Sequence, residues 1–168
     1  MDRRRILAST SALALAGLPA GALLLPVRSA LAHHGWSSFD PARPLFLAGR
    51  IATVHWRNPH VEFELDVAPG LALPSGLAER TIPAQTVALD AKDILSRTQL
   101  PQPAQGRWTI ELAPLTRMRA WAVEPLREGE TVEVVGYTFA QERPERVLRA
   151  EWLFRGGKAY GMRSSPAG

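Results

Sequence analysis

The 168-residue chain contains no cysteine, which excludes a disulfide scaffold, a thiolate metal site and a cysteine nucleophile together. It also lacks the Gly-x-Ser-x-Gly pattern of a nucleophile elbow. A phosphate-binding loop is incomplete, because Gly156-Gly157-Lys158 lacks the rest of that motif. Methionines are too few and too widely spaced for a thioether copper(I) site. The 46% apolar content nevertheless excludes a disordered chain and suffices for one globular domain.

The first 32 residues have the pattern of a cleaved export signal. Three arginines, Arg3-Arg4-Arg5, precede an apolar stretch over residues 7–27, and Ala30-Leu31-Ala32 offers the small side chains that a signal peptidase requires. We therefore expect cleavage after Ala32, a periplasmic protein and no stable membrane anchor. An uncleaved anchor is the alternative, which Pro19 and Pro26 disfavour.

The route of export has two candidate mechanisms. The Arg3-Arg4-x-Ile6-Leu7 pattern resembles the twin-arginine signal. Asp2 and Ala8 differ from the residues more usual in that signal, so the general secretory route stays open.

Charge argues against a nucleic-acid partner. The formal charge of +4 falls to +1 once residues 1–32 are removed, because they hold four arginines and one aspartate. A balanced protein outside the cytoplasm has no electrostatic attraction to a polyanion.

The remaining chain predicts one β domain. We expect an N-terminal arm at 33–44, a β-barrel domain at 45–160 with an insertion at 68–105, and a tail at 161–168. The strongest strand alternates four apolar residues with Glu62, Glu64 and Asp66, a stripe that we interpret as the solvated side of a sheet. Five strands are predicted, over residues 45–56, 61–67, 107–112, 131–139 and 147–154.

Two strands carry more specific predictions. A bulge near Ala52-Thr53 would bring both apolar sets of the first strand inward. In the fifth strand, alternation predicts one apolar face and a basic outer face that includes Arg149. The expected core consists of Ile51, Val54, Phe63, Leu65, Ile110, Val132, Val134, Leu148 and Trp152.

Two short helices are expected between the strands. Asp90 is placed as an N-cap, with Leu89 and Ile94 as a hydrophobic staple, for a helix that ends at Arg97. A second helix is expected over residues 116–121. The fold class is therefore all-β with short helices: a small five-stranded OB-like barrel, with a small β-sandwich as the alternative.

The histidines carry the clearest chemistry. Cleavage after Ala32 makes His33 the N-terminal residue, so its α-amine and its ring Nδ1 can chelate one metal ion. One further imidazole completes a histidine brace, a three-nitrogen site that favours copper, with zinc second. We expect His33 and His60 as ligands and His34 as an auxiliary or alternative ligand, with Asp40 orienting an imidazole.

Less specific interpretations of these residues stay open. The two adjacent histidines could lie in a frayed arm that binds nothing. His60 could be a turn residue that satisfies a local carbonyl, and His55 is the weakest candidate. Trp36 is expected to fold back and anchor the arm.

Two motifs give a family resemblance. His33-His34-Gly35-Trp36 and Trp56-x-Asn58-Pro59-His60 resemble an uncharacterised family of exported bacterial proteins, a domain of unknown function. The resemblance implies a periplasmic location and a small β domain, and it supplies no activity.

The functional expectation therefore comes from residue chemistry. We expect a copper carrier, sensor or storage module rather than an enzyme. The alternative is a metal-free OB-type module that binds an exported protein, peptide or glycan. An oxidative copper enzyme is a third option, for which the sequence shows no substrate surface.

Overall fold

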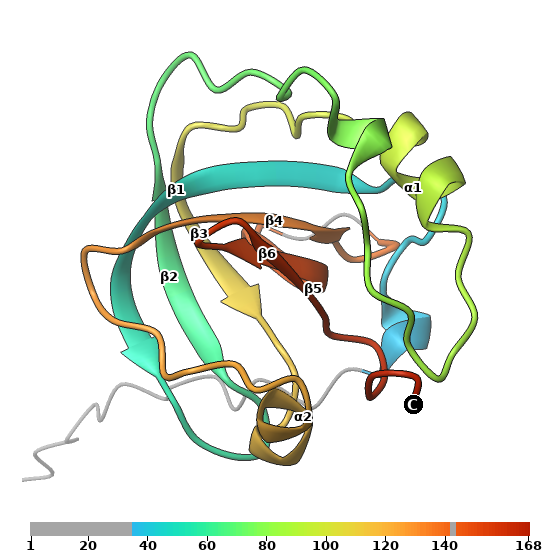
Figure 1. Cartoon of the computed structure of the whole chain (residues 1–168). Coiled ribbons are helices and arrows are strands. Elements are labelled where there is room, and N and C mark those ends of the chain that lie inside the picture. Colours follow the sequence, from blue (N-terminus) through green and yellow to red (C-terminus); the bar gives the residue numbers. More distant parts are fainter. Residues whose placement is uncertain (1–34, 142–143) are drawn as a thin grey trace, which may run out of the picture. The chain divides into compact units, whose positions relative to one another are not determined.

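The structure, a computed structural model, describes residues 35–141 and 144–168 of the chain (Figure 1). These residues form six strands and two short α-helices with the segments that connect them. None of the described helices is long and apolar enough to cross a membrane. The strands are β1 (Leu45–His55), β2 (Glu62–Val67), β3 (Gly106–Glu111), β4 (Thr131–Tyr137), β5 (Val147–Arg155) and β6 (Lys158–Gly161). The helices are α1 (Ala91–Arg97) and α2 (Leu115–Ala120).

The strands close into a barrel. β1 pairs antiparallel with both β2 and β4, β2 pairs with β3, and β4 pairs with β5. A parallel pairing of β3 with β5 completes the circle, and β6 adds to β5 from outside. The result is a closed five-stranded mixed β-barrel with one extra strand, which confirms the OB-like prediction over the sandwich.

A bulge in β1 confirms the expected switch of face. The register with β2 shifts between Ile51 and Thr53, so apolar residues of opposite parity contact the interior before and after this point. Gly49 lies before the bulge at a close approach of two strands, where an added Cβ would be 2.3 Å from the carbonyl oxygen of Asp66.

A second bulge, in β5, overturns the single apolar face predicted for that strand. The register with β4 shifts between Ala150 and Trp152, which leaves Glu151 as the extra residue. Leu148 and Ala150 therefore face the barrel interior, whereas Trp152 packs in a separate cluster. The prediction of a basic outer face was also wrong, because both faces of β5 are buried.

The predicted core is largely confirmed. Seven of the nine residues are fully buried inside the barrel, Val54 is half-buried at its margin, and Trp152 is fully buried outside it. The seven are Ile51, Phe63, Leu65, Ile110, Val132, Val134 and Leu148.

The long connection between β2 and β3 explains the second cluster. It contains a 3₁₀ turn (Leu77–Glu79) and α1, whose first turn is capped by Asp90 Oδ1 accepting from the Asp93 N–H at 2.9 Å, as predicted. This segment covers apolar side chains on the outside of β1, β4 and β5, so a surface that would otherwise be wet is buried. The outer cluster contains Phe46, Leu77, Ile94, Leu95, Val135, Trp152 and Phe154.

Candidate functional site

The N-terminal arm docks on the barrel from Trp36 onward. Phe39 forms an isolated bridge with Phe139, and their rings stack with centroids 4.7 Å apart. Beside them the Asp40 N–H donates to the Thr138 carbonyl at 3.0 Å. The arm is therefore attached to the barrel at Phe39 and Asp40, whereas the two histidines of the frayed-arm interpretation lie outside the described residues.

Trp36 anchors this arm on two arginines. Its ring lies 4.0 Å from the guanidinium carbon of Arg163 and 5.3 Å from that of Arg149. It also meets the ring of Tyr137 edge-on at 6.5 Å. Cation–π contacts of this kind are stronger when the cation is desolvated. Tyr137 is buried, and this burial is the largest cause that raises its pKa to about 12.

Both arginines form ion pairs with buried carboxylates. Arg149 Nη1 lies 3.1 Å from Glu111 Oε2, and both side chains are about 95% buried. Arg163 Nε donates to Glu151 Oε2 at 2.8 Å, and Glu151 has no exposed surface. Burial raises the pKa of Glu151, whereas its bond to Arg163 opposes the rise. Sequence reasoning missed this polar centre, because it placed these β5 residues on a wet face.

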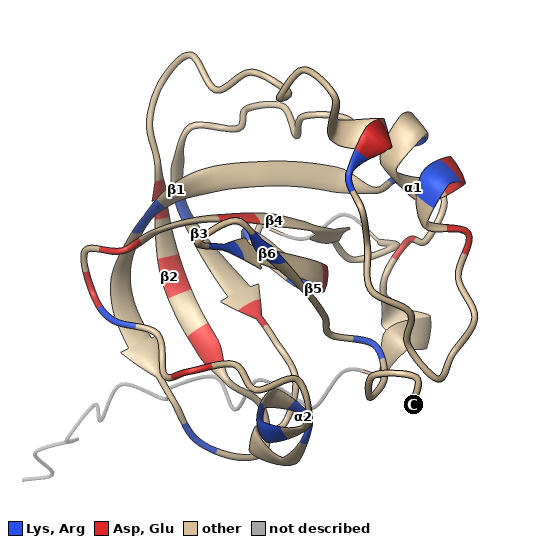
Figure 2. Cartoon of the chain, in the orientation of Figure 1, with Lys and Arg blue, Asp and Glu red and all other residues tan. Residues whose placement is uncertain are grey.

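Ionisable side chains on adjacent strands form a row around the barrel, from the Arg149–Glu111 pair to His55. His55 lies opposite Glu62 in the β1–β2 pairing, and Glu62 lies opposite Glu111 in the β2–β3 pairing. Glu111 in turn pairs with Arg149 beneath Trp36. Burial first, and then repulsion by Glu111, raises the pKa of the Glu62 carboxyl. Figure 2 shows these acids on β2 and at the end of β3.

The rest of the acidic stripe on β2 behaves as predicted. Asp66 forms a bidentate bond with Arg107 at 2.8 and 2.9 Å in an exposed position. Glu64 accepts a hydrogen bond from the Thr109 hydroxyl at 3.1 Å. Of the three acids on β2, Glu62 is therefore the one that lies opposite another carboxylate, that of Glu111.

The turn that carries His60 lies directly before this row. Asn58 Oδ1 accepts from the Leu115 N–H at 3.1 Å, and the Asn58–Pro59 peptide is cis. Val61, which follows His60, donates its N–H to the Ala113 carbonyl at 3.0 Å. The turn is thus fixed to the start of α2, and His60 is half-buried in it, two residues before Glu62.

The other predicted site residues have different outcomes. His55 is exposed at the end of β1. Asp40 closes a local turn, because it accepts from Arg43 Nε at 2.7 Å and from the Ala42 N–H at 3.0 Å. The Arg43 hydrogen bond is the main cause of its lowered pKa. His33, His34 and the predicted cleavage after Ala32 lie outside the described residues.

Within residues 35–141 and 144–168, no three His, Asp or Glu side chains come close enough to hold a metal ion. The predicted ligands His33 and His34 are not among these residues.

Comparison with known proteins finds a family match for one segment of the chain. Residues 22–73 match a family described as a family of unknown function (DUF6152). Both motifs of the resemblance, the His-His arm and the Trp-x-Asn-Pro-His turn, lie inside this match, which confirms it. No curated protein and no solved structure matches the chain.

Proposed function

We propose that this small β-barrel protein is exported, is cleaved after Ala32, and binds copper through its new N-terminus. His33 supplies its α-amine and ring, His60 supplies an imidazole, and His34 is an auxiliary or alternative ligand. A neutral α-amine and imidazoles form a nitrogen donor set, for which copper(II) leads the divalent affinity order and zinc follows. The role is carriage, sensing or storage rather than catalysis.

The observation that carries the proposal is the docking of Trp36. A free terminus loses conformational entropy when it closes around a metal, which weakens the site. Here the contacts of Trp36, Phe39 and Asp40 already restrain the arm close to its start. Much of the conformational entropy that the arm must lose on binding a metal is therefore already lost in the folded, metal-free protein.

Chain length agrees with a site on this face. Residues 33–36 span at most about 10 Å when extended. Trp36 rests on Arg149 of β5, and β5, β3 and β2 are successive neighbours in the barrel. Two strand spacings also amount to about 10 Å, so the strand that follows His60 is within reach of the arm.

The charge of the surface also favours a cation. In OB folds the face of the second and third strands, with the loop that precedes it, is a common binding surface. Here that face carries Glu62, Glu64 and Asp66. Asp66 is neutralised by Arg107, and Glu111 at the edge by Arg149, whereas Glu62 and Glu64 form no ion pair within the described residues. Such a face repels nucleic acid and attracts a metal ion.

A second candidate function, a metal-free glycan- or peptide-binding module, is favoured by one cavity. It has a volume of about 530 Å³ and lies where Leu45 and the start of β3 meet the segment after β4. Amide and aromatic side chains line much of it, as they do many sites for polar ligands, together with the charged Arg43, Glu145 and Arg146. The amide and aromatic side chains include Gln99, Gln102, Gln141, Trp108 and Phe139.

Copper(II) titration of two single variants tests the ligand assignment. His60→Ala should weaken binding by at least about tenfold, because one of three nitrogen ligands is lost. His55→Ala, a matched change on the neighbouring strand, should leave the affinity within about twofold. The titration uses protein whose intact mass shows that it begins at His33, with a competing chelator. Equal losses in the two variants would contradict a role for His60 as a ligand.

A further inference from the structure

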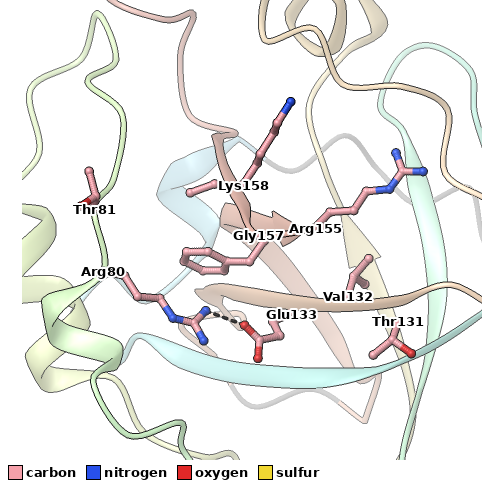
Figure 3. A pocket seen from close by; sticks show the side chains of 11 residues that line it. Arg80, Thr81, Thr131, Val132, Glu133, Arg155, Gly157 and Lys158 are labelled. Carbon is pink, nitrogen blue, oxygen red and sulfur yellow. Dashed lines mark hydrogen bonds and ion pairs between the residues drawn. The ribbon is translucent and has the colours of Figure 1, made fainter.

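A second cavity lies on the outer corner of the barrel, where β4 and β6 begin and β5 ends. It has a volume of about 590 Å³ and is lined from three segments of the chain: residues 80–81, 131–133 and 154–159 (Figure 3). Arg149 and Arg155 are six residues apart on β5, or about 20 Å along the strand. The cavity is therefore separate from the surface around Trp36.

One wall presents an arginine that is already held in place. Arg80 Nη1 donates to Glu133 Oε2 at 2.5 Å, and the Arg80 guanidinium lies 4.7 Å from the centre of the Phe154 ring. A guanidinium has five N–H donors, so this single bond leaves others for a ligand. Because both contacts fix its position, Arg80 loses little freedom when it binds one.

The opposite side carries a different kind of cation. Lys158 follows the Gly156-Gly157 hairpin turn, whose φ angles of 57° and 76° suit glycine. The Lys158 side chain is exposed and forms no ion pair within the described residues. By contrast, Arg155 is engaged by Glu130 at 2.7 Å. In Figure 3 the Lys158 side chain lies at the far side from the Arg80–Glu133 pair and extends away from it.

We propose that this cavity binds a small sugar acid. Its carboxylate would bind the Lys158 ammonium, since this is the lining cation with no acidic partner. Its hydroxyl groups would bond to Arg80 and Glu133, which together offer donors and acceptors, and to the Thr81 and Thr131 hydroxyls. The absence of side chains at Gly156 and Gly157 leaves the rim open for such a ligand.

The test is an NMR titration of the ¹⁵N-labelled protein with D-glucuronate, D-glucose and acetate. Glucuronate should shift the amide signals of Gly156, Gly157 and Thr131. Glucose and acetate should each bind at least about tenfold more weakly, since each lacks one half of the recognition. The chain has one other lysine, Lys92 on α1, which gives a charge-matched control. Lys158→Gln should weaken glucuronate binding by about tenfold, and Lys92→Gln should not change it.

Each contrary result removes the proposal. No shift at these amides with millimolar glucuronate would show that the cavity takes no sugar acid. Equal binding of acetate would reduce the site to a carboxylate contact, and equal binding of glucose would remove the role of charge. Equal effects of the two lysine variants would place the interaction elsewhere. None of these outcomes depends on copper binding.

Discussion

Phe63→Ala is expected to lower the free energy of unfolding by about 3–5 kcal/mol. Phe63 has no exposed surface and lies inside the barrel on β2, opposite Ile110 of β3. Truncation removes the apolar surface buried by the ring and leaves a cavity that a closed barrel cannot easily collapse. Urea unfolding followed by circular dichroism measures the change.

A surface truncation provides the control for this variant. Leu73→Ala removes a large apolar side chain that is 42% exposed, and it should cost less than about 1 kcal/mol. If the two variants lost similar amounts of stability, Phe63 would not occupy a closed interior, and the barrel topology described above would be in error.

The second large effect concerns the ion pair beneath Trp36. Arg149→Met should destabilise the protein by about 3–5 kcal/mol, because it leaves the Glu111 carboxylate buried without its cation. The double variant Arg149→Met, Glu111→Gln should recover part of this loss, since it removes the unpaired charge. The same unfolding measurement applies to both variants.

An exposed ion pair between β2 and β3 is the control that separates the effect of burial on stability from the effect of charge pairing. Asp66 and Arg107 form a closer, bidentate bond, yet both side chains are at least half exposed. Arg107→Met should therefore cost less than about 1 kcal/mol. A loss for Arg149→Met no larger than that for Arg107→Met would mean that the pair beneath Trp36 is not sealed from water.

Much of the fold could be predicted because strand periodicity reports the buried face directly. The alternation around Phe63 and the kink near Ala52 placed β1 and β2 correctly. The same reasoning failed at Glu151, because a charged residue fits an alternating pattern and conceals a bulge. It also failed for Trp152, because alternation does not reveal that a distant segment covers the outside of a sheet.

The candidate site was predictable only where motifs are local in sequence. The His60 turn and the anchoring role of Trp36 follow from nearby residues. The contacts of Trp36 with Arg149 and Arg163 join segments more than 100 residues apart, and no local pattern indicates them. The pairing of Glu62 with Glu111 likewise depends on the β2–β3 register.

The most direct test of the copper site is an electron paramagnetic resonance comparison of two copper(II)-loaded proteins. One begins at His33, and the other carries a single additional glycine before it. The insertion keeps every imidazole but removes the α-amine from the chelate ring with the His33 side chain. We expect a changed copper spectrum and an affinity lower by at least about tenfold, or roughly 1.4 kcal/mol, in the extended protein. Identical spectra and equal affinities would contradict a site built on the N-terminal amine.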